Sequence, residues 1–393
     1  MDEYPGFSTG KTVLMKLALF LTFKVSLEEW LDKGLFDREK LLYEELLRRK
    51  IFSEVLWLTY GCGDKKIAEQ LKQTHRLHND IQVIQMPAVF CMPFGKLFYS
   101  LLMPMIMKKI LKDTDILMTN QMSGSWSAVI AKKMHKKPLI VRTGYTLSSF
   151  LKKRQGAKLK AIAAAILERI TYKNADAAVT GSQEDKDYIC SAYKIPQQKI
   201  NVFGNYIDID TFKPVNCEKY NDRIVFVGRL TGQKNLFNLL KAISKTSFTL
   251  DIYGQGELGD ELQQEAKKLN IQVNFMGVVP NKELPGILNR YRYYILPSLY
   301  EGTPKSLLEA MACGLICIGT DAAGINEIIT DGVNGLLAKG TDAESIFEAI
   351  ERAKNRPGES ISLAATETIK NKFSLESIVK KYSQLLERIE DGC

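Results

Sequence analysis

The chain alternates short apolar runs with longer segments in which apolar residues recur every three or four positions. In the first half, the short runs predict strands over residues 17–23, 54–59, 81–86, 116–118, 138–142 and 177–180. Between them, residues 37–49, 65–73, 126–134 and 158–172 have the spacing of amphipathic helices. Alternation of this kind predicts a parallel sheet covered by helices, as in a Rossmann-like domain.

The second half repeats this pattern. Strands are predicted over residues 224–227, 249–253, 273–276, 293–296 and 315–319, each followed by a helical segment. A length of 393 residues suits roughly two domains. We therefore expect an α/β protein with one Rossmann-like domain over residues 1–205, a polar hinge over 206–220 and a second Rossmann-like domain over 221–372. A C-terminal helix is expected over residues 373–393, and one possibility is that it crosses back to the first domain. Residues 1–14 are interpreted as an extension that precedes the first strand.

Composition narrows the class of protein. Hydrophobic residues make up 45% and charged residues 25%, which excludes a disordered or collagen-like chain. Seven cysteines without a CxxC pair indicate neither a zinc site nor a redox motif and fit a reducing cytosol best. No stretch reaches the roughly 18–20 uncharged apolar residues that cross a bilayer. We therefore expect a cytoplasmic protein, and peripheral binding to the inner face of the plasma membrane is one possibility.

Two signals in the first half are weak. Residues 6–12 resemble a P-loop but have three residues between the glycines instead of four, and they precede the first strand. His75 and His78 have no nearby carboxylate or cysteine, so no metal is expected there, and His135 lies in a basic run.

A stronger pattern follows the strand over residues 224–227. Gly228 and Arg229 come directly after it, and Lys234 follows before the next helical segment. Ligands bind at the carboxyl ends of strands in doubly wound sheets, so both cations are expected at one crevice. Two cations there suit a diphosphate.

A second anion-binding element follows the strand over residues 293–296. Thr303 is a good N-cap and Pro304 a good first helical residue, which predicts a helix starting there. The amides of Lys305 and Ser306 would then point into the crevice, where free amides and the helix dipole attract phosphate.

Two carboxylates flank this predicted helix start. Gly302 allows close approach to the backbone, and Glu301 stands where it can accept hydrogen bonds from hydroxyl groups. Glu309 lies within the helix, near a sugar that the phosphates would position. The alternative is that Glu301 and Glu309 are solvated charges at a helix end.

Further motifs occur in order along the chain: residues 253–256 (Tyr-Gly-Gln-Gly), the hinge run 204–208 with 212–214, and the Glu301-x7-Glu309 spacing. Together with Gly228, Arg229 and Lys234, they resemble the retaining glycosyltransferases of family 4. The resemblance covers most of residues 175–390. It implies the GT-B fold, in which two Rossmann-like domains face each other across a cleft.

The resemblance also implies roles for residues. Arg229 and Lys234 would hold the diphosphate of a nucleotide-sugar donor, Glu309 would bind its ribose, and Glu301 would contact its sugar. The other donor-binding residues implied are Gly228, Gly254, Gly277, Val278, Gly302, Thr303, Pro304, Lys305 and Ser306. Such enzymes are thought to use a front-face displacement, so no nucleophile, metal or cofactor is expected.

The first half departs from the family pattern. Ser26 and Trp30 stand near where many members carry a glycine-rich loop, and Gly144 and Tyr145 stand where many carry a histidine. These four residues are the candidates for the acceptor side.

The net charge of +9 is concentrated in one segment. Residues 1–200 carry 32 basic and 20 acidic groups, a net +12, and residues 201–393 carry 22 and 25, a net −3. Residues 96–173 alone hold 16 basic and 3 acidic groups, a net +13. Large apolar residues alternate with these lysines and few stacking aromatics are present, which favours an anionic membrane surface over nucleic acid. The alternative is a solvated helix packed on the core.

The sequence therefore predicts a retaining glycosyltransferase that moves a sugar from a UDP- or GDP-sugar to a lipid-linked or polysaccharide acceptor in cell-envelope glycan synthesis. Two alternatives stay open: a catalytically silent GT-B scaffold subunit, and a GT-B enzyme of another kind, such as a sugar-nucleotide epimerase or a phosphorylase.

Overall fold

The computed structural model describes residues 15–152, 158–356 and 358–391. The P-loop-like residues 6–12 and the expected extension over 1–14 lie outside these ranges. The chain divides into two compact units. The first unit comprises the chain up to Thr180, residues 188–201 and the end of the last helix from Tyr382; the second comprises Gly181–Asp187 and Val202–Lys381.

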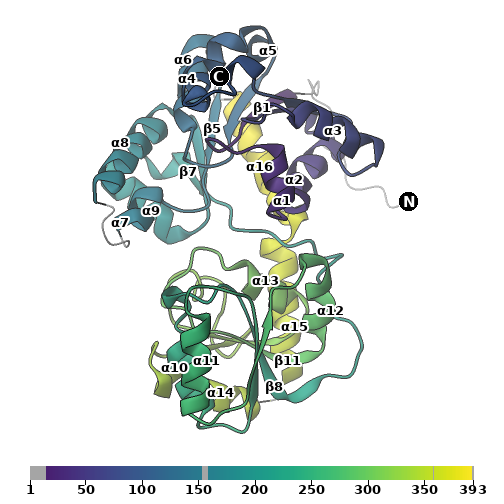
Figure 1. The fold of residues 1–393 in the computed structure, drawn as a ribbon, viewed down its shortest axis with the longest axis vertical. Coiled ribbons are helices and arrows are strands. Elements are labelled where there is room, and N and C mark those ends of the chain that lie inside the picture. The colour runs from purple at the N-terminus through teal and green to yellow at the C-terminus, as the bar shows by residue number, and fades with distance from the viewer. Residues whose placement is uncertain (1–14, 153–157, 357, 392–393) are drawn as a thin grey trace. The chain divides into compact units, whose positions relative to one another are not determined.

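The first unit is built on a seven-stranded sheet (Figure 1). Its strands are β1 (Met15–Phe20), β2 (Phe52–Leu58), β3 (Ile81–Ile84), β4 (Ile116–Thr119), β5 (Leu139–Arg142), β6 (Ala177–Thr180) and β7 (Ile200–Val202). The order is β3-β2-β1-β4-β5-β6-β7, and β1 pairs in parallel with both β2 and β4. All six predicted strands are present. Only β7 was not predicted, because a strand of three residues is too short to form a recognisable apolar run.

Helices cover both faces of this sheet. They are α1 (Leu27–Asp32), α2 (Phe36–Arg48), α3 (Asp64–Gln73), α4 (Gly95–Ile106), α5 (Lys108–Lys112), α6 (Ser125–His135), α7 (Leu147–Lys152), α8 (Lys158–Asn174) and α9 (Gln183–Tyr193). In Figure 1, α6 and α8 lie on the opposite side of the sheet from α2 and α3. On each of the longer helices, apolar residues on one side are buried. Because such residues recur about every 3.6 positions, their spacing in the sequence predicted these helices.

The second unit has a six-stranded sheet. Its strands are β8 (Tyr220–Val227), β9 (Thr249–Tyr253), β10 (Val273–Gly277), β11 (Tyr291–Leu296), β12 (Ile316–Thr320) and β13 (Leu336–Ala338). The order is β10-β9-β8-β11-β12-β13, with β8 parallel to both β9 and β11. The helices are α10 (Leu236–Ile243), α11 (Gly259–Lys268), α12 (Leu284–Asn289), α13 (Lys305–Ala312), α14 (Ala343–Lys354), α15 (Gly358–Thr368) and α16 (Leu375–Asp391). The five predicted strands are present, and β13 is additional.

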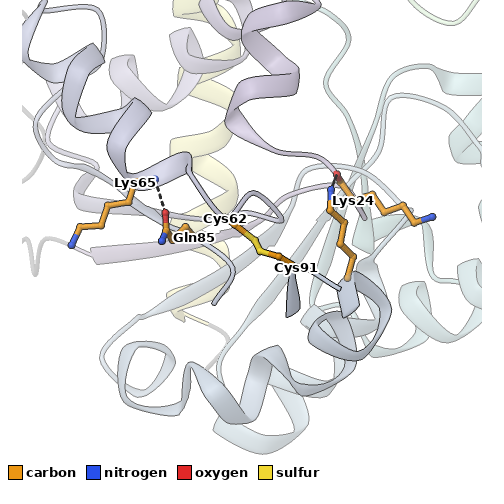
Figure 2. Close-up of a disulfide and its surroundings, with 6 residues drawn as sticks. Lys24, Cys62, Lys65, Gln85 and Cys91 are labelled. Carbon is orange, nitrogen blue, oxygen red and sulfur yellow. Dashed lines mark hydrogen bonds between the residues drawn. A yellow bond between two sulfur atoms is a disulfide. The ribbon is translucent and has the colours of Figure 1, made fainter. Parts of the chain in front are cut away.

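A disulfide joins Cys62, in the loop after β2, to Cys91, in the segment before α4 (Figure 2). The sequence did not predict this pair, because the two cysteines are 29 residues apart and only the fold brings them together. Among the described residues, Cys190, Cys217, Cys313 and Cys317 are not in disulfides, and burial raises the pKa of Cys313 to about 12.

No helix in the described part of the chain reaches the roughly 20 consecutive apolar residues that cross a bilayer. The longest, α8 and α16, have 17 residues each. None of the described helices is both long and apolar enough to cross a membrane.

Candidate functional site

The candidate site lies in the second unit, where the strand order reverses. β8 and β11 are neighbours in the sheet, yet the chain runs outward from β8 to β9 and β10 before returning to β11. The loops that follow β8 and β11 diverge at such a switch point and leave room for a ligand at the strand ends. Gly228 and Arg229 follow β8, and Ser298 to Gly302 follow β11.

An ion pair links these two loops. Lys234 Nζ lies 2.5 Å from Glu301 Oε1, and only 11% and 9% of the two side chains are exposed. Gln233 Nε2 donates to the carbonyl of Tyr300 at 2.8 Å and lies 3.4 Å from Glu301 Oε2. The Glu301 carboxylate is therefore held by two groups from the loop after β8, in a largely desolvated position where a charge needs a partner.

Arg229 has a different setting from Lys234. It comes directly after β8, its side chain is exposed, and no hydrogen bond or ion pair to its guanidinium is found among the residues that the structure describes. Arg229 therefore adds a solvated positive charge at the strand end where Lys234 is already neutralised by Glu301. An anion at this position would find one accessible cation and one shared cation.

Two glycines allow the loops of the site to lie in contact. Gly254 has a φ of +140°, and a Cβ there would lie 1.9 Å from the carbonyl oxygen of Gly228. Gly324, at a φ of +77°, would place a Cβ 2.0 Å from the carbonyl oxygen of Gly302. Both positions exclude any side chain, so glycine lets the loop after β9 lie against the loop after β8, and the segment after β12 lie against the loop after β11.

The helix after β11 starts later than the sequence predicted. We expected Thr303 as N-cap and Pro304 as the first helical residue, but α13 begins at Lys305 with Pro304 in the N-cap position. Pro304 is extended, with a ψ of 108°, and its carbonyl accepts from the amides of Leu307 and Leu308. Thr303 instead belongs to the loop, where its carbonyl accepts a 2.6 Å hydrogen bond from Asn205 Nδ2. The prediction failed because it counted proline as helical.

The start of α13 still offers an anion-binding end. Ser306 lies in the first turn, where an amide has no acceptor within the helix. Its hydroxyl accepts from Tyr294 OH at 2.8 Å, which fixes the turn against β11. Burial raises the pKa of Tyr294 well above its ordinary value, so this hydroxyl stays protonated as the donor.

Glu309 is buried on α13. Its Oε1 atom lies 3.4 Å from Asn281 Nδ2 and 3.5 Å from Lys305 Nζ, one turn earlier on the helix. Since only 4% of the Glu309 side chain is exposed, the interpretation of Glu309 as a solvated charge at a helix end is wrong. Gly277, at the end of β10, has a φ of +72° with open space around it, and Val278 is exposed beside it.

The structure separates the four acceptor-side candidates of the first unit. Ser26 is the N-cap of α1, where its hydroxyl accepts from the amide of Glu29 at 3.1 Å. Trp30 is 3% exposed and packs edge-on against Trp57 in the core, so it presents no surface to an acceptor. Gly144 donates its amide to Gln121, and Tyr145 is exposed, packed against Phe150.

Three residues of the second-unit site were missed from the sequence. Gln233 contacts Glu301, Asn281 contacts Glu309, and Asn205 contacts Thr303. Each is an uncharged amide whose partner lies between 28 and 98 residues away in the chain, so no local spacing marked it. In the described ranges, no three His, Cys, Asp or Glu side chains are close enough together to hold a metal ion.

Two family models match the chain. Residues 208–371 match the model described as glycosyl transferases group 1, and residues 41–211 match the model described as glycosyltransferase family 4. The two matches adjoin near the hinge and together cover most of the chain.

Curated relatives are similar at low identity. An uncharacterized glycosyltransferase of Methanocaldococcus jannaschii is 27% identical over 345 residues, 79% of this chain and 86% of that protein. A UDP-Gal:alpha-D-GlcNAc-diphosphoundecaprenol alpha-1,3-galactosyltransferase of Escherichia coli is 27% identical over 265 residues, 62% of this chain and 68% of that protein. The match spans from 48% to 86% of the length of such relatives.

The fold has close counterparts among solved structures. Anabaena HepE in complex with UDP has a TM-score of 0.73 at 17% sequence identity, with 95% of this chain and all of that chain covered. At that identity the likeness shows the fold.

Proposed function

This chain belongs to glycosyltransferase family 4 and has the GT-B fold, and from that premise we propose that it is a retaining enzyme. It transfers a sugar from a UDP- or GDP-sugar to a lipid-linked or polysaccharide acceptor in cell-envelope glycan synthesis. The observation that carries this proposal is the set of charged groups at the strand ends of the second unit: Arg229, the Lys234–Glu301 pair and buried Glu309.

The donor occupies the switch point of the second unit. Its diphosphate binds Arg229 and the ammonium of Lys234, which has three donor hydrogens and can keep Glu301 while binding a phosphate oxygen. The start of α13 faces the same anion through its first-turn amides. Glu309 accepts from the ribose hydroxyls, and its partners Asn281 and Lys305 hold the carboxylate ready for them.

The reaction draws on charge that develops on the leaving group. The bond between the anomeric carbon and the phosphate oxygen breaks, and the nucleoside diphosphate leaves with the electron pair. The acceptor oxygen bonds to the same face of that carbon, and its proton passes to the departing phosphate. Arg229 and Lys234 stabilise the transition state more than the ground state because the diphosphate charge grows along this path.

Glu301 acts by position. Its carboxylate is already bound by Lys234 and Gln233, an arrangement that supports a role in accepting hydrogen bonds from the donor sugar and aligning it with the diphosphate. The HepE structures with UDP and with UDP-glucose support a uridine donor for this fold. The name of the E. coli relative supports an acceptor sugar carried on a polyprenol diphosphate.

The proposal is tested by incubating the enzyme with UDP-, GDP- and ADP-sugars, with and without a polyprenol-diphosphate-linked sugar. Release of nucleoside diphosphate only when the acceptor is present, with retention of anomeric configuration by NMR, is the expected result. A nucleotide that binds without any release would indicate a silent scaffold, and an epimerised donor without acceptor would indicate an epimerase; either would overturn the proposal.

The test also has a residue-level arm. Arg229→Ala is expected to abolish transfer, since it removes the solvated cation of the site, and Lys267→Ala, an exposed cation on α11, is the matched control. Equal transfer by Arg229→Ala and Lys267→Ala would contradict the assignment of the donor site.

A further inference from the structure

One face of α4 is apolar although it is exposed. Six large side chains on this helix are between 40% and 58% exposed: Leu97, Phe98, Leu101, Leu102, Met105 and Ile106. Their spacing places them on a single side of the helix, opposite buried Tyr99 and Met103. A helix on the surface of a soluble domain normally presents polar residues to the solvent. α4 differs, because both its buried and its exposed sides are apolar, and an exposed apolar face of this kind is typical of a binding surface.

The segment before α4 continues this surface. Val89, Met92 and Phe94 are all exposed, and Phe94 has 79% of its surface in solvent. Phe94 also has a φ of +63°, a left-handed conformation that a bulky residue rarely adopts and that costs free energy. The Cys62–Cys91 disulfide fixes the middle of this segment to the loop after β2 (Figure 2). The segment is thus held with its apolar side chains outward.

Hydrogen bonds on the inner side hold α4 against the domain. Trp126 Nε1 of α6 donates to Ser100 Oγ at 3.0 Å, and the His135 ring contacts the carbonyl of Pro104 at 3.0 Å. The two bonds lie about one turn apart, in the middle and near the C-terminal end of α4, and they hold this part of the helix with its outer face away from α6. The exposed apolar face of α4 is therefore a fixed part of the folded domain's surface.

A second apolar face lies on α8, which, like α4, packs against α6. Leu159, Ile162, Ile166 and Ile170 are exposed at helical spacing. Buried Ser125 of α6 bonds Thr171 of α8, with 2.8 Å between the hydroxyl oxygens. Three neighbouring helices thus carry two exposed apolar faces.

The charges around these faces have one sign. Lys108, Lys109 and Lys112 of α5 are exposed directly after α4. α4, α5 and α6 contain no acidic residue, and the one acidic residue of α8, Glu168, is buried and accepts from Tyr193 OH at 2.6 Å. Asp113, after α5, is paired with Lys16 at 2.5 Å. No acidic side chain on these four helices is therefore exposed to offset the lysines.

We infer that the exposed face of α4, with Val89, Met92 and Phe94 before it and the lysines of α5 after it, docks on an anionic phospholipid surface. The apolar side chains insert among the acyl chains near the headgroups, and the lysines bind the lipid phosphates. This inference rests on the proposed function and extends it, because a lipid-linked acceptor would be held in such a membrane surface.

Charge argues for a membrane and against a second copy of the chain as the occupant. Two copies meeting through this face would bring together two segments that each hold 16 basic and 3 acidic groups over residues 96–173. Such like charges repel, whereas an anionic leaflet attracts every lysine near its surface.

The inference is tested by flotation of the full chain with vesicles of phosphatidylcholine alone and of phosphatidylcholine with roughly 30% phosphatidylglycerol. The wild type is expected to float with the anionic vesicles only. Phe98→Gln/Met105→Gln should lower binding by roughly tenfold, because two apolar side chains no longer insert. The control is Leu363→Gln, an equally exposed apolar residue on α15 of the second unit, which should float as the wild type does.

A charge pair completes the design. Lys109→Gln/Lys112→Gln should lower anionic binding by roughly tenfold, and Lys241→Gln/Lys267→Gln, exposed lysines of α10 and α11, should not change it. Circular dichroism of each variant confirms that the fold is kept. Equal flotation with both vesicle types, or unchanged flotation of both first-unit variants, would overturn the inference. A wild type that is dimeric by light scattering, made monomeric by Phe98→Gln/Met105→Gln without vesicle binding, would overturn it in favour of self-association.

UDP binding to the same samples separates this inference from the proposed function. If the wild type binds UDP but not the anionic vesicles, only the inference of a docking surface is contradicted, and the proposed function is kept. Vesicle binding by a chain that binds no nucleotide would leave the docking surface and remove the proposed enzyme.

Discussion

The two units share one topology but differ in what stands at the switch point of the sheet. In the first unit, β1 and β4 are the neighbours at which the strand order reverses, and Phe23 follows β1. The Phe23 ring packs against Tyr60 and Trp126, with centroids 5.6 and 5.2 Å away. In the second unit, the same place holds Arg229, Lys234 and Glu301. Equivalent backbones thus present an aromatic cluster in one unit and paired charges in the other.

We propose that this difference divides the function between the two units. A charged, partly desolvated switch point suits a nucleoside diphosphate, whereas an aromatic one with an apolar, basic helix face nearby suits a partner with lipid or sugar character. The architecture alone would not distinguish the two sites, because both sheets are parallel and doubly wound. Function here depends on a few side chains at strand ends.

The position of the tryptophans gives a way to probe the units separately. All three, Trp30, Trp57 and Trp126, belong to the first unit, so tryptophan fluorescence reports on that unit while circular dichroism reports on both.

The largest effect is expected for Gly254→Ala. The new Cβ would lie 1.9 Å from the carbonyl oxygen of Gly228, and the residue has a φ of +140°, so the loop after β8 must move. We expect a loss of about 4 kcal/mol from the stability of the second unit, measured by urea unfolding with circular dichroism. The tryptophan transition should stay in place.

Gly277→Ala is the matched control for that change. Gly277 also has a positive φ, +72°, but nothing lies within 4 Å of its Cβ position. The expected loss is about 1 kcal/mol from backbone strain alone. Equal losses for the two variants would show that contact with Gly228 does not matter.

A smaller effect is expected for Lys234→Met. It leaves the Glu301 carboxylate largely buried without its cation, at a cost of roughly 2–3 kcal/mol in urea unfolding. In the first unit, Lys33→Met removes an exposed partner of Glu29 and should change little. If both variants unfold at the wild-type urea concentration, the Lys234–Glu301 pair is not a desolvated ion pair.

Glu309→Gln should act on binding more than on stability. The amide keeps the size of the carboxylate but loses the charge that strengthens hydrogen bonds to hydroxyl groups, so nucleotide affinity should fall by roughly tenfold in calorimetry. Glu348→Gln, on α14 of the same unit, serves as the control. Unchanged affinity for Glu309→Gln would remove this residue from the donor site.

The smallest effect concerns pH and the first unit. Burial would raise the pKa of Glu39, but Arg142 and Arg38 outweigh it and lower the pKa below its ordinary value of 4.5. A lowered pKa stabilises the fold above the unfolded value and loses that contribution as the pH falls below it. Tryptophan-detected stability of the wild type should therefore drop more steeply below pH 4.5 than that of Glu39→Gln. Parallel pH profiles would contradict the pairing of Glu39 with Arg142.

The sequence predicted the strands well because most of them lie buried in a parallel sheet and form apolar runs in the sequence. In residues 177–180 and 249–253, prediction and structure agree. It also predicted that residues following neighbouring strands meet at one edge of the sheet, as Lys234 and Glu301 do. The donor-binding role of these two residues and Arg229 stays a prediction. Sequence reasoning missed Gln233 and Asn281, whose roles depend on partners distant in sequence. It misplaced Trp30 because a tryptophan in a loop-like stretch gives no sign of which way it faces.

The disulfide and the outer face of α4 show a second limit of sequence reasoning. Cysteine spacing carries no signal when the partners come from separate βα units, as Cys62 and Cys91 do. An apolar helix such as α4 reads the same whether its residues face the core or the solvent, because both sides are apolar. Only the packing of α4 on α6 determines which side is exposed.

The account rests on a nucleotide site at the strand ends of the second unit, and calorimetric titration of UDP and GDP into the wild type and Arg229→Ala tests it most directly. We predict that one of the two nucleotides binds the wild type at a single site, and that Arg229→Ala binds it at least roughly tenfold more weakly. No binding of either nucleotide to the wild type, or equal affinity of the two proteins, would contradict the account.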